Sequence, residues 1–472
     1  MERCADSGAG CPGRGSHAAP YGKLAARRGA SQERVIANQR ERILGAVVQI
    51  VAERGYSELR VRDVAALAGV STRTFYEIYD DKQDCFLDAH WMIARRSARN
   101  VLAAGAGAES FEQQMRAAFL AFTGQIAHRP RAARFALVEV LAGGEAARTQ
   151  MRESHAIYEK MLARSFAAAP DAIVVPPRMI EGIVAGVAQV CRAHLLAGRA
   201  NELSEAAEEL VDWALALRCK QAAMVSRLPP APARSRPAAA RAAPGSRDDR
   251  QRLMAAAIRL AARDGYRQLS GTGLRAATGV SRAHFEQSFQ GARDCLQQAV
   301  QERIEEALKS SASVGASAPD WPRGVHRATT EFCALMSADP DFAVAALIEL
   351  PAAGRESLAP RHEIAAAAAR ALLTSAPGAL AFTEARAHAS IAATWAVMRR
   401  LVAAGQLRRL PASAATLSFL ILAPAVGGER ALKAIAAEQL LAPQSRPRPG
   451  TARQADRARR QGTGAGAFEL SG

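Results

Sequence analysis

The sequence lacks the long apolar runs and leader segments that mark membrane and secreted chains. It has 472 residues and no uninterrupted run of 18 or more apolar residues. Its nearest approach, residues 410–428, contains two prolines and two serines and would make a poor membrane span. Residues 1–17 contain no apolar core of the kind that a signal peptide needs. We therefore expect a cytoplasmic protein with no membrane partner.

Cysteine-based sites and the common catalytic motifs are also missing. The seven cysteines are scattered, odd in number and without a C-x-x-C pair, which fits a reducing compartment rather than a disulfide scaffold or a zinc site. The chain has no P-loop, no H-E-x-x-H and no G-x-S-x-G motif, and the pair His362-Glu363 has no second histidine at the required spacing. We predict no enzymatic activity, no metal site and no cofactor.

Positive charge is abundant, but three segments hold most of it. The net charge is +17, and residues 1–30, 218–247 and 443–472 together carry +14 of it. Basic arms of this kind can bind phosphates without sequence preference. They also arise from an Ala/Arg/Pro-rich composition that has no role, and the sequence leaves both interpretations open.

The same segments divide the chain. Residues 223–247 contain five prolines, which is typical of a semi-extended linker that builds no core, and residues 443–472 have the same character. Elsewhere apolar residues recur at spacings of three and four, and runs of alternating β-branched residues are absent. The predicted fold class is all-α.

An internal repeat is the strongest sign of how the chain is organised. A shift of 210 residues aligns 40–90 with 250–300 without a gap, and 15 of the 51 aligned residues are identical. The matches include Gly69/Gly279, Phe75/Phe285 and Cys85/Cys295. A shared alanine bias would not align glycines, aromatics and cysteines, so we predict two copies of one unit of about 200 residues.

The first copy predicts a helix-turn-helix. Its first helix places four apolar side chains on one face: Ile43, Val47, Ile50 and Val51. A short helix is expected at 61–68, followed by Gly69, a residue suited to a left-handed turn. Ser71 can cap the next short helix, at 72–79. This arrangement is the one that inserts its second helix into a DNA major groove.

The run VRDVAALAGVSTRTFYEIYDDKQDCFLDAH, residues 61–90, resembles the DNA-binding domain of the tetracycline-repressor (TetR) family of bacterial transcriptional regulators. The shared elements are the GVS turn, the T-F-Y centre, the aromatic at Tyr79 and the D-K pair that opens the following helix. The resemblance implies a three-helix DNA-binding domain and then a larger helical domain that binds a small effector. It also implies that the last two helices of that domain form a dimer interface.

The residue types around this helix indicate how DNA would be read. Arg73 suits a bidentate contact with guanine, and Tyr76 suits a phosphate contact. The resemblance carries backbone contacts over to Tyr79 and Lys82. Tyr79 could instead seal the core, and Arg73 could be a solvated charge. The candidate DNA-binding residues are Arg62, Ser71, Thr72, Arg73, Thr74, Tyr76, Tyr79 and Lys82.

The second copy keeps the turn, the cap and the core phenylalanine but changes the exposed residues. It has Arg282, Ala283 and His284 at the start of the second helix, and Glu286 replaces Tyr76. A glutamate at that position would be repelled by DNA. The second copy is therefore either a degenerate unit that no longer reads DNA or a reader of a different half-site through Arg282 and His284.

These inferences predict seven segments. They are a disordered basic arm at 1–32, a DNA-binding domain at 33–90, a helical effector-binding and dimerisation domain at 91–222, a linker at 223–247, a second, degenerate helix-turn-helix domain at 248–300, a second helical regulatory domain at 301–442 and a disordered basic tail at 443–472.

The predicted protein is a regulator, most simply a repressor, that binds double-stranded DNA under the control of a small-molecule effector. The effector and its pocket residues stay unknown. The two units could form an intramolecular pseudo-dimer with its reading helices about 34–36 Å apart, or the chain could form a homodimer. The alternatives are a helical sensor or protein-interaction protein that has lost DNA binding, and a protein whose basic arms bind DNA non-specifically.

Overall fold

The computed structural model describes residues 32–171, 173–228, 249–352, 358–378, 380 and 382–440. Within these ranges all regular structure is helical and there is no strand, which confirms the predicted all-α class. The predicted basic arm apart from its last residue, most of the linker and the basic tail lie outside the described residues.

The first half of the chain forms ten α-helices and three short 3₁₀ turns among its described residues. They are α1 (Gln32–Arg54), η1 (Tyr56–Glu58), α2 (Val61–Ala68), α3 (Thr72–Tyr76), α4 (Lys82–Gly105), α5 (Phe111–His128), α6 (Pro130–Leu137), η2 (Glu139–Gly143), α7 (Gly144–Ala168), α8 (Pro177–Leu196), η3 (Ala200–Glu202), α9 (Leu203–Ala216) and α10 (Lys220–Val225). Val225 is buried, so the folded part continues beyond the predicted boundary at 222.

The second half follows the same order at its start. Its elements are α11 (Asp249–Asp264), η4 (Tyr266–Gln268), α12 (Gly271–Thr278), α13 (Arg282–Ser288), α14 (Ala292–Ala316), α15 (Trp321–Ala338), α16 (Pro340–Val344), the π-helical turn η5 (Ala345–Glu349), α17 (Leu350–Ala352), α18 (Leu358–Ser375), α19 (Glu384–Ala403), η7 (Leu407–Arg409), α20 (Leu410–Val426) and α21 (Gly428–Leu440). The series α11, η4, α12, α13, α14 repeats the series α1, η1, α2, α3, α4.

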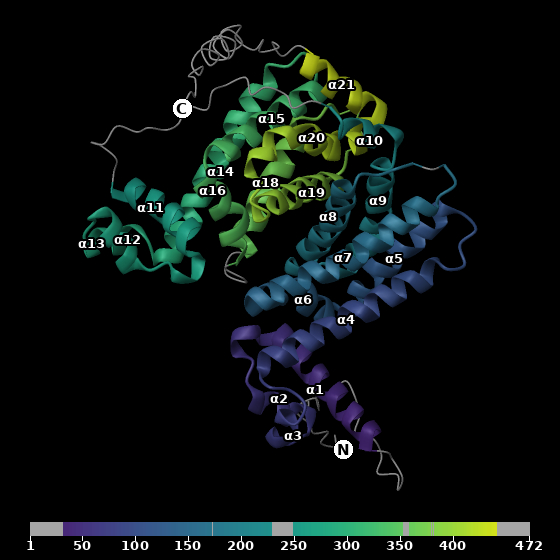
Figure 1. The fold of residues 1–472 in the computed structure, drawn as a ribbon, viewed down its shortest axis with the longest axis vertical. Helices are drawn as coiled ribbons and strands as arrows, with labels where there is room; N and C mark the ends of the chain where they lie inside the picture. Colours follow the sequence, from purple (N-terminus) through teal and green to yellow (C-terminus); the bar gives the residue numbers. More distant parts are fainter. Residues whose placement is uncertain are drawn as a thin grey trace, which may run out of the picture.

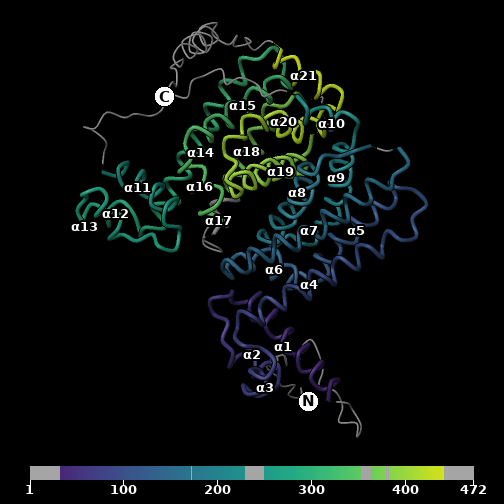
Figure 2. Tube along the Cα trace, in the orientation of Figure 1, coloured from purple at the N-terminus to yellow at the C-terminus, as the bar shows by residue number. Residues whose placement is uncertain are grey.

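Helices from the two halves pack together at the centre of the molecule. Figures 1 and 2 show α8 and α9 lying against α19 and α20, while the segments α1–α3 and α11–α13 project from this body at two separate places. The helices α8 and α19 approach closely at Gly186, where a Cβ atom would lie 2.8 Å from the carbonyl oxygen of Ala389. Any larger residue there would force the two halves apart.

Polar contacts accompany this packing. The fully buried Trp213 on α9 donates from Nε1 to Oγ of Ser390 on α19 at 2.9 Å. Arg400 on α19 pairs with Glu181 on α8 at 3.3 Å, and burial raises the pKa of Glu181 to about 7 despite that partner. The central contact therefore combines an apolar seam with paired charges.

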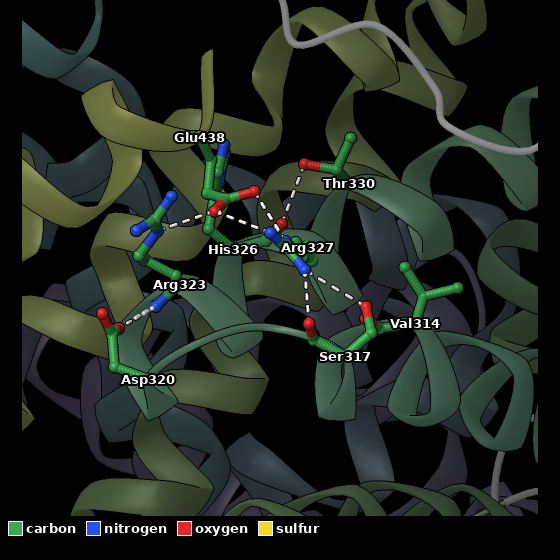
Figure 3. Close-up of polar contacts among 8 residues, drawn as sticks. All are labelled: Val314, Ser317, Asp320, Arg323, His326, Arg327, Thr330 and Glu438. Atoms are coloured by element: carbon green, nitrogen blue, oxygen red, sulfur yellow. Dashed lines mark hydrogen bonds and ion pairs between the residues drawn. The ribbon is translucent and has the colours of Figure 1, made fainter. Parts of the chain in front are cut away.

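A buried ion cluster holds the last described helix in place. Glu438 on α21 accepts from Arg323 at 2.7 Å and from Arg327 at 2.6 Å, and both arginines belong to α15 (Figure 3). Next to it, His326 bonds through Nδ1 to Ser418 on α20 at 2.8 Å. Because Glu438 is only 4% exposed, loss of either arginine would leave a buried charge with fewer partners.

Two helices are apolar and long enough to cross a membrane, but the fold uses them as core. They are Pro177–Leu196 and Leu407–Val426, and 61% and 72% of their most apolar windows are buried inside the protein. The second contains residues 410–426 of the uncharged run 410–428, and they form one helix that continues through Pro424. Their apolar character is explained by the central packing of the two halves.

Candidate nucleic-acid interface and ligand cavity

The turn between α2 and α3 has the predicted geometry. Gly69 adopts a left-handed conformation with φ 63°, and the side chain of Ser71 accepts a hydrogen bond from the backbone N of Thr74 at 2.9 Å. Phe75 is fully buried beneath the helix. The helix itself is shorter than predicted, since it ends at Tyr76 and the chain turns before α4.

Several predicted DNA-binding residues share the surface around α3. The side chains of Arg73 and Arg62 are 89% and 80% exposed, and Tyr76 is 59% exposed, a high value for an aromatic. Ser71 and Thr72 are exposed as well, and Thr74 is half-buried. Arg73 pairs with Glu77, its neighbour one turn along, at 3.1 Å, and Arg62 on α2 pairs with Asp63 at 3.5 Å. An exposed aromatic and an exposed guanidinium group on one short helix are suited to a polyanionic partner.

Tyr79 does not belong to this surface. Its side chain is buried and its hydroxyl donates to Oδ2 of Asp88 at 2.7 Å, while Arg40 binds the same carboxylate through two nitrogens at 2.9 and 2.7 Å. Burial, and secondarily the bond to Asp88, raises the pKa of Tyr79 above its usual range. The prediction that Tyr79 touches phosphate conflicts with this placement, and the alternative, that it seals the core, agrees with it.

Lys82 is also engaged within the fold. Its Nζ donates to the backbone oxygen of Leu59 at 3.1 Å and lies 5.2 Å from the centre of the Tyr56 ring. Asp81 caps the same helix by accepting from two backbone nitrogens. The half-buried Lys82 thus joins the start of α4 to η1, and in this conformation its ammonium does not extend from the surface.

The segment 249–300 forms the same turn with a different surface. Gly279 is left-handed with φ 72°, and Ser281 caps α13 by accepting from the backbone N of His284 at 3.2 Å. The side chain of Arg282 is 76% exposed and pairs with Glu286 at 2.7 Å. His284 is 60% exposed and bonds to Asp249 at 2.9 Å. Both candidate DNA contacts of this segment therefore face an acidic partner.

Sequence reasoning missed the residues that brace these two segments. Arg40 and Asp88 hold Tyr79 in the first, and Glu349 accepts from the backbone N of Tyr266 at 2.7 Å in the second. The identity of Arg40 and Arg250 across the repeat was the available signal, since an exposed arginine on a surface helix has no packing reason to be kept in register.

A cavity of about 1150 Å³ lies beside the N-terminal segment 33–90. Its walls come from α1, α4, α5, α6, α7 and α8. No pocket residue was predicted from the sequence. The lining includes five aromatic and histidine residues: Phe119, Phe122, His128, His155 and Tyr158.

The deep polar groups of this cavity are neutral. The hydroxyl of Tyr158 donates to Oγ of Ser97 at 2.8 Å. Burial lowers the pKa of His90 to about 4, and burial together with the nearby cations Arg192 and Arg399 lowers the pKa of His155 to about 3. Both imidazoles are therefore uncharged at neutral pH.

The cavity also touches the elements that carry α3. Gly45, Val48 and Gln49 of α1 form part of its wall, as does α6, which begins at Pro130. Arg131 of α6 pairs with Glu53 of α1 at 3.5 Å. A molecule inside the cavity would therefore contact both the helices α4–α8 and α1, the first helix of the segment that carries α3.

One comparison with known proteins falls on the N-terminal helix-turn-helix. A family model described as "Bacterial regulatory proteins, tetR family" matches residues 43–89. The chain shares 18% identity with the fatty acid degradation regulator FadR from Bacillus halodurans, over 38% of this chain and 97% of that one, with a TM-score of 0.35. FadR from Bacillus subtilis, solved in complex with stearoyl-CoA, is 15% identical over the same shares, again with a TM-score of 0.35.

A TetR-family regulator from Rhodococcus sp. is 24% identical over 38% of this chain and 98% of its own, with a TM-score of 0.34. No curated protein matched the sequence significantly. The family match falls on α1–α4, where Ser71 caps a short helix that exposes Arg73 and Tyr76. Residues 43–89 are thus similar to bacterial regulatory proteins of the tetR family, and they form a helix-turn-helix, the arrangement that inserts its second helix into a DNA groove.

Proposed function

We propose that the chain is a cytoplasmic repressor built from two TetR-like units, in which the first unit reads DNA and a ligand in its cavity controls that reading. The observation that carries the proposal is the capped helix α3 with Arg73 and Tyr76 exposed on it. A short helix that presents an exposed arginine and a solvent-facing tyrosine suits the major groove and its flanking phosphates.

The tandem arrangement is supported by matched contacts in the two halves. Each half has a left-handed glycine, a capping serine and a buried phenylalanine at equivalent positions: Gly69, Ser71 and Phe75, and Gly279, Ser281 and Phe285. Proline opens the short helix α6 in one half and α16 in the other. Chance helical packing would not repeat these features at one constant shift.

The central packing supports an intramolecular pseudo-dimer. The predicted final helix pair of the first unit corresponds to α8 and α9, and its counterpart in the second unit is α19 and α20. The close approach at Gly186 and the bond from Trp213 to Ser390 join these pairs within one chain. In this arrangement a single chain takes the place of the usual two subunits, and a homodimer is not needed for DNA binding.

We assign reading and positioning roles within the first unit. Arg73 reads base edges, while Arg62, Ser71, Thr72, Thr74 and Tyr76 contact the backbone or neighbouring bases. Tyr79 and Lys82 act by holding α3 and α4 in place, because their polar atoms are engaged inside the fold. In the second unit, Glu286 stands in place of Tyr76 and His284 bonds to Asp249, which favours a degenerate unit over a second half-site reader. The pair between Arg282 and Glu286 does not distinguish the two units, because Arg73 pairs with Glu77 in the same way.

Effector control follows from the shared wall of the cavity. A ligand that binds one arrangement of α1 and α6 better than another shifts the population between them, and it lowers DNA affinity if the favoured arrangement misplaces α3. The ion pair between Arg131 and Glu53 joins the two helices α6 and α1 that form this wall. The small-molecule effector thus acts on the base of the DNA-binding segment rather than on α3 itself.

Selection of genomic fragments bound by the full chain tests the proposal, followed by titration of a selected duplex and a shuffled one. Arg73→Ala is expected to reduce the preference for the selected duplex by about 5- to 150-fold, the worth of one bidentate base contact. Arg282→Ala is the matched control, since it removes an exposed arginine from the first turn of α13. That variant is expected to keep the preference.

Two other outcomes would replace the proposal. An equal loss with Arg282→Ala would make the second unit a reader of its own half-site. Unchanged preference in Arg73→Ala, together with loss of all binding when residues 1–30, 223–247 and 443–472 are removed, would assign DNA binding to the basic segments. Absence of any DNA binding by the intact chain would favour a sensor or protein-interaction role.

A further inference from the structure

We propose that the cavity of the first half takes an amphipathic anion, a molecule with one acidic group and a long aliphatic body. This inference deepens the proposed function and rests on it for the effect of the ligand on DNA. The class of ligand is argued from the charge of the lining, the position of its arginines and the character of its interior.

The lining carries charge of one sign. Among the described residues that line the cavity, none is an aspartate or a glutamate, whereas three are arginines: Arg96, Arg129 and Arg131. Arg131 is offset by its contact with Glu53. In the part of the chain that the structure describes, Arg96 and Arg129 form no ion pair, so a ligand carboxylate or phosphate would be their first anionic partner.

The two unpaired arginines lie on the same side of a polar bond between α4 and α5. Asn100 donates to Gln125 at 3.1 Å across these helices, and a contact between Gly105 and Gln114 shows that the helices run in opposite directions. Arg96 precedes Asn100 by four residues within α4, and Arg129, the residue that ends α5, follows Gln125 by four, so each lies about one turn further toward the same end of the helix pair. Both steps lead toward the same end of the cavity.

The remainder of the cavity is mostly apolar. Its wall includes Met115, Phe119, Phe122, Met151, Leu162 and Ile183. Leu102 and Leu120 belong to the lining and yet are 58% and 41% exposed, which makes the edge of the cavity apolar too. A charge placed among these side chains without a partner would be costly, so the acidic group must stay with the arginines.

The interior excludes other ligand types. The lining histidines His90 and His155 carry no charge that could hold a second anionic group, and the cations near His155, Arg192 and Arg399, do not belong to the lining. No lining carboxylate is present among the described residues to hold a cationic ligand. A volume of about 1150 Å³ accommodates a chain of a dozen or more carbons, since drug-sized sites span roughly 300–1,000 Å³.

Gly124 provides a way to fill this cavity without disturbing its walls. It lies within α5 and lines the cavity, and a Cβ atom built on it would meet no atom within 4 Å. Gly124→Leu therefore adds an apolar side chain where space is open. Gly124→Ala is its control, because it makes the same change of backbone entropy with little added volume.

The test is calorimetric titration of the full chain, without DNA, with three probes of equal length below their micelle concentrations. The probes are dodecanoate, 1-dodecanol and dodecyltrimethylammonium. We expect dodecanoate to bind at least about tenfold more tightly than the alcohol, as one charge-assisted contact predicts, and the cation to bind weakest. Arg96→Ala/Arg129→Ala should bring acid and alcohol to within about twofold of each other.

Matched variants make the result decisive. Arg99→Ala removes an exposed arginine of α4 that does not line the cavity, and it should leave the preference for the acid intact. Gly124→Leu should weaken dodecanoate binding at least about tenfold relative to Gly124→Ala. Equal binding of acid and alcohol, an equal loss in Arg99→Ala, or unchanged binding in Gly124→Leu would each overturn the inference.

A second measurement separates this inference from the proposed function. The selected duplex is titrated with and without saturating dodecanoate. If the acid binds with the expected dependence on Arg96 and Arg129 but leaves DNA affinity unchanged, the ligand class stands and effector control fails. If DNA is read specifically but the three probes bind without preference, the regulator assignment stands and the ligand class fails.

Discussion

The segments 33–90 and 248–300 share a backbone arrangement but hold it together differently. In the first, Arg40 binds Asp88, which in turn accepts from the hydroxyl of Tyr79. At the matching positions of the second, Arg250 bonds to Gln298 at 2.8 Å and its guanidinium lies 5.5 Å from the centre of the Phe289 ring. Arg250 also pairs with Glu302 at 2.7 Å, so the arginine keeps a carboxylate partner, but that partner lies one helical turn beyond the position of Asp88.

Their exposed residues differ more than their cores. The first segment presents Arg73 and Tyr76, and the second presents Ala283 and Glu286 at the same places. Side chains that pack beneath the helices constrain folding, whereas those on the outer surface constrain only binding. The comparison teaches that the second segment has kept what it needs to fold and changed what it would need to bind DNA.

Among the predictions that compare the two segments, truncation of their core phenylalanines should have the largest effect on stability and DNA binding. Phe75→Ala and Phe285→Ala each remove a ring that is 0% or 6% exposed, and each should lower the free energy of unfolding of its segment by about 3–5 kcal/mol. Only Phe75→Ala should also abolish binding to the selected duplex, because only α3 reads DNA. Denaturant unfolding and duplex titration measure the two effects.

The same pair defines what would contradict the comparison. If Phe285→Ala abolishes DNA binding while the first half stays folded, the second segment contributes to reading. Amide hydrogen exchange tells the cases apart, since it reports separately on α1–α4 and on α11–α14 in each variant.

Much of the fold was predictable because it depends on local chemistry. The apolar periodicity gave the all-α class, and the helix at 61–68 has the predicted bounds because Gly69 ends it by a left-handed turn. The cap at Ser71 was predictable for the same reason. The second helix was overextended, from Tyr76 to Tyr79, because the chain has to turn early to bury Tyr79 against Asp88.

The site was less predictable because it depends on contacts between distant helices. Sequence spacing cannot tell whether Lys82 reaches outward or back to Leu59, which lies 23 residues earlier. The cavity is assembled from six helices, so no local pattern announces it. The exposure of Arg73 and Tyr76 follows from the helix and its buried Phe75 alone, whereas their contact with DNA stays a prediction.

The pH dependence of unfolding should extend the comparison to the longer helices α4 and α15, each of which carries a buried histidine. Burial lowers the pKa of His90 in α4 and of His326 in α15 from 6.5 to about 4. The unfolded chain therefore binds more protons than the folded one as pH falls below about 6.5, and stability is lost between that pH and about 4. Each histidine should contribute up to about 1.4 kcal/mol per pH unit.

Replacement of these histidines measures that contribution. His90→Gln and His326→Gln should each flatten the dependence of the unfolding free energy on pH, measured by urea unfolding from pH 7 to pH 4.5. His128→Gln serves as the control, since it changes an exposed histidine instead. An unchanged slope in His326→Gln beside a flattened one in His90→Gln would mean that the second half is less tightly packed than the first.

The smallest expected effect concerns the contact of Tyr79 with Asp88 and Arg40. Tyr79→Phe removes the hydroxyl that donates to Asp88 but leaves the ring and the two bonds from Arg40, so the unfolding free energy should fall by about 1 kcal/mol. Phe289→Tyr adds the missing hydroxyl to the second segment, where Gln298 already accepts from Arg250, and should not stabilise it. Because the hydroxyl of Tyr79 is used inside the fold, Tyr79→Phe should also leave the salt dependence of DNA binding unchanged. A shallower dependence would place the tyrosine back on a phosphate and make its bond to Asp88 one that DNA displaces.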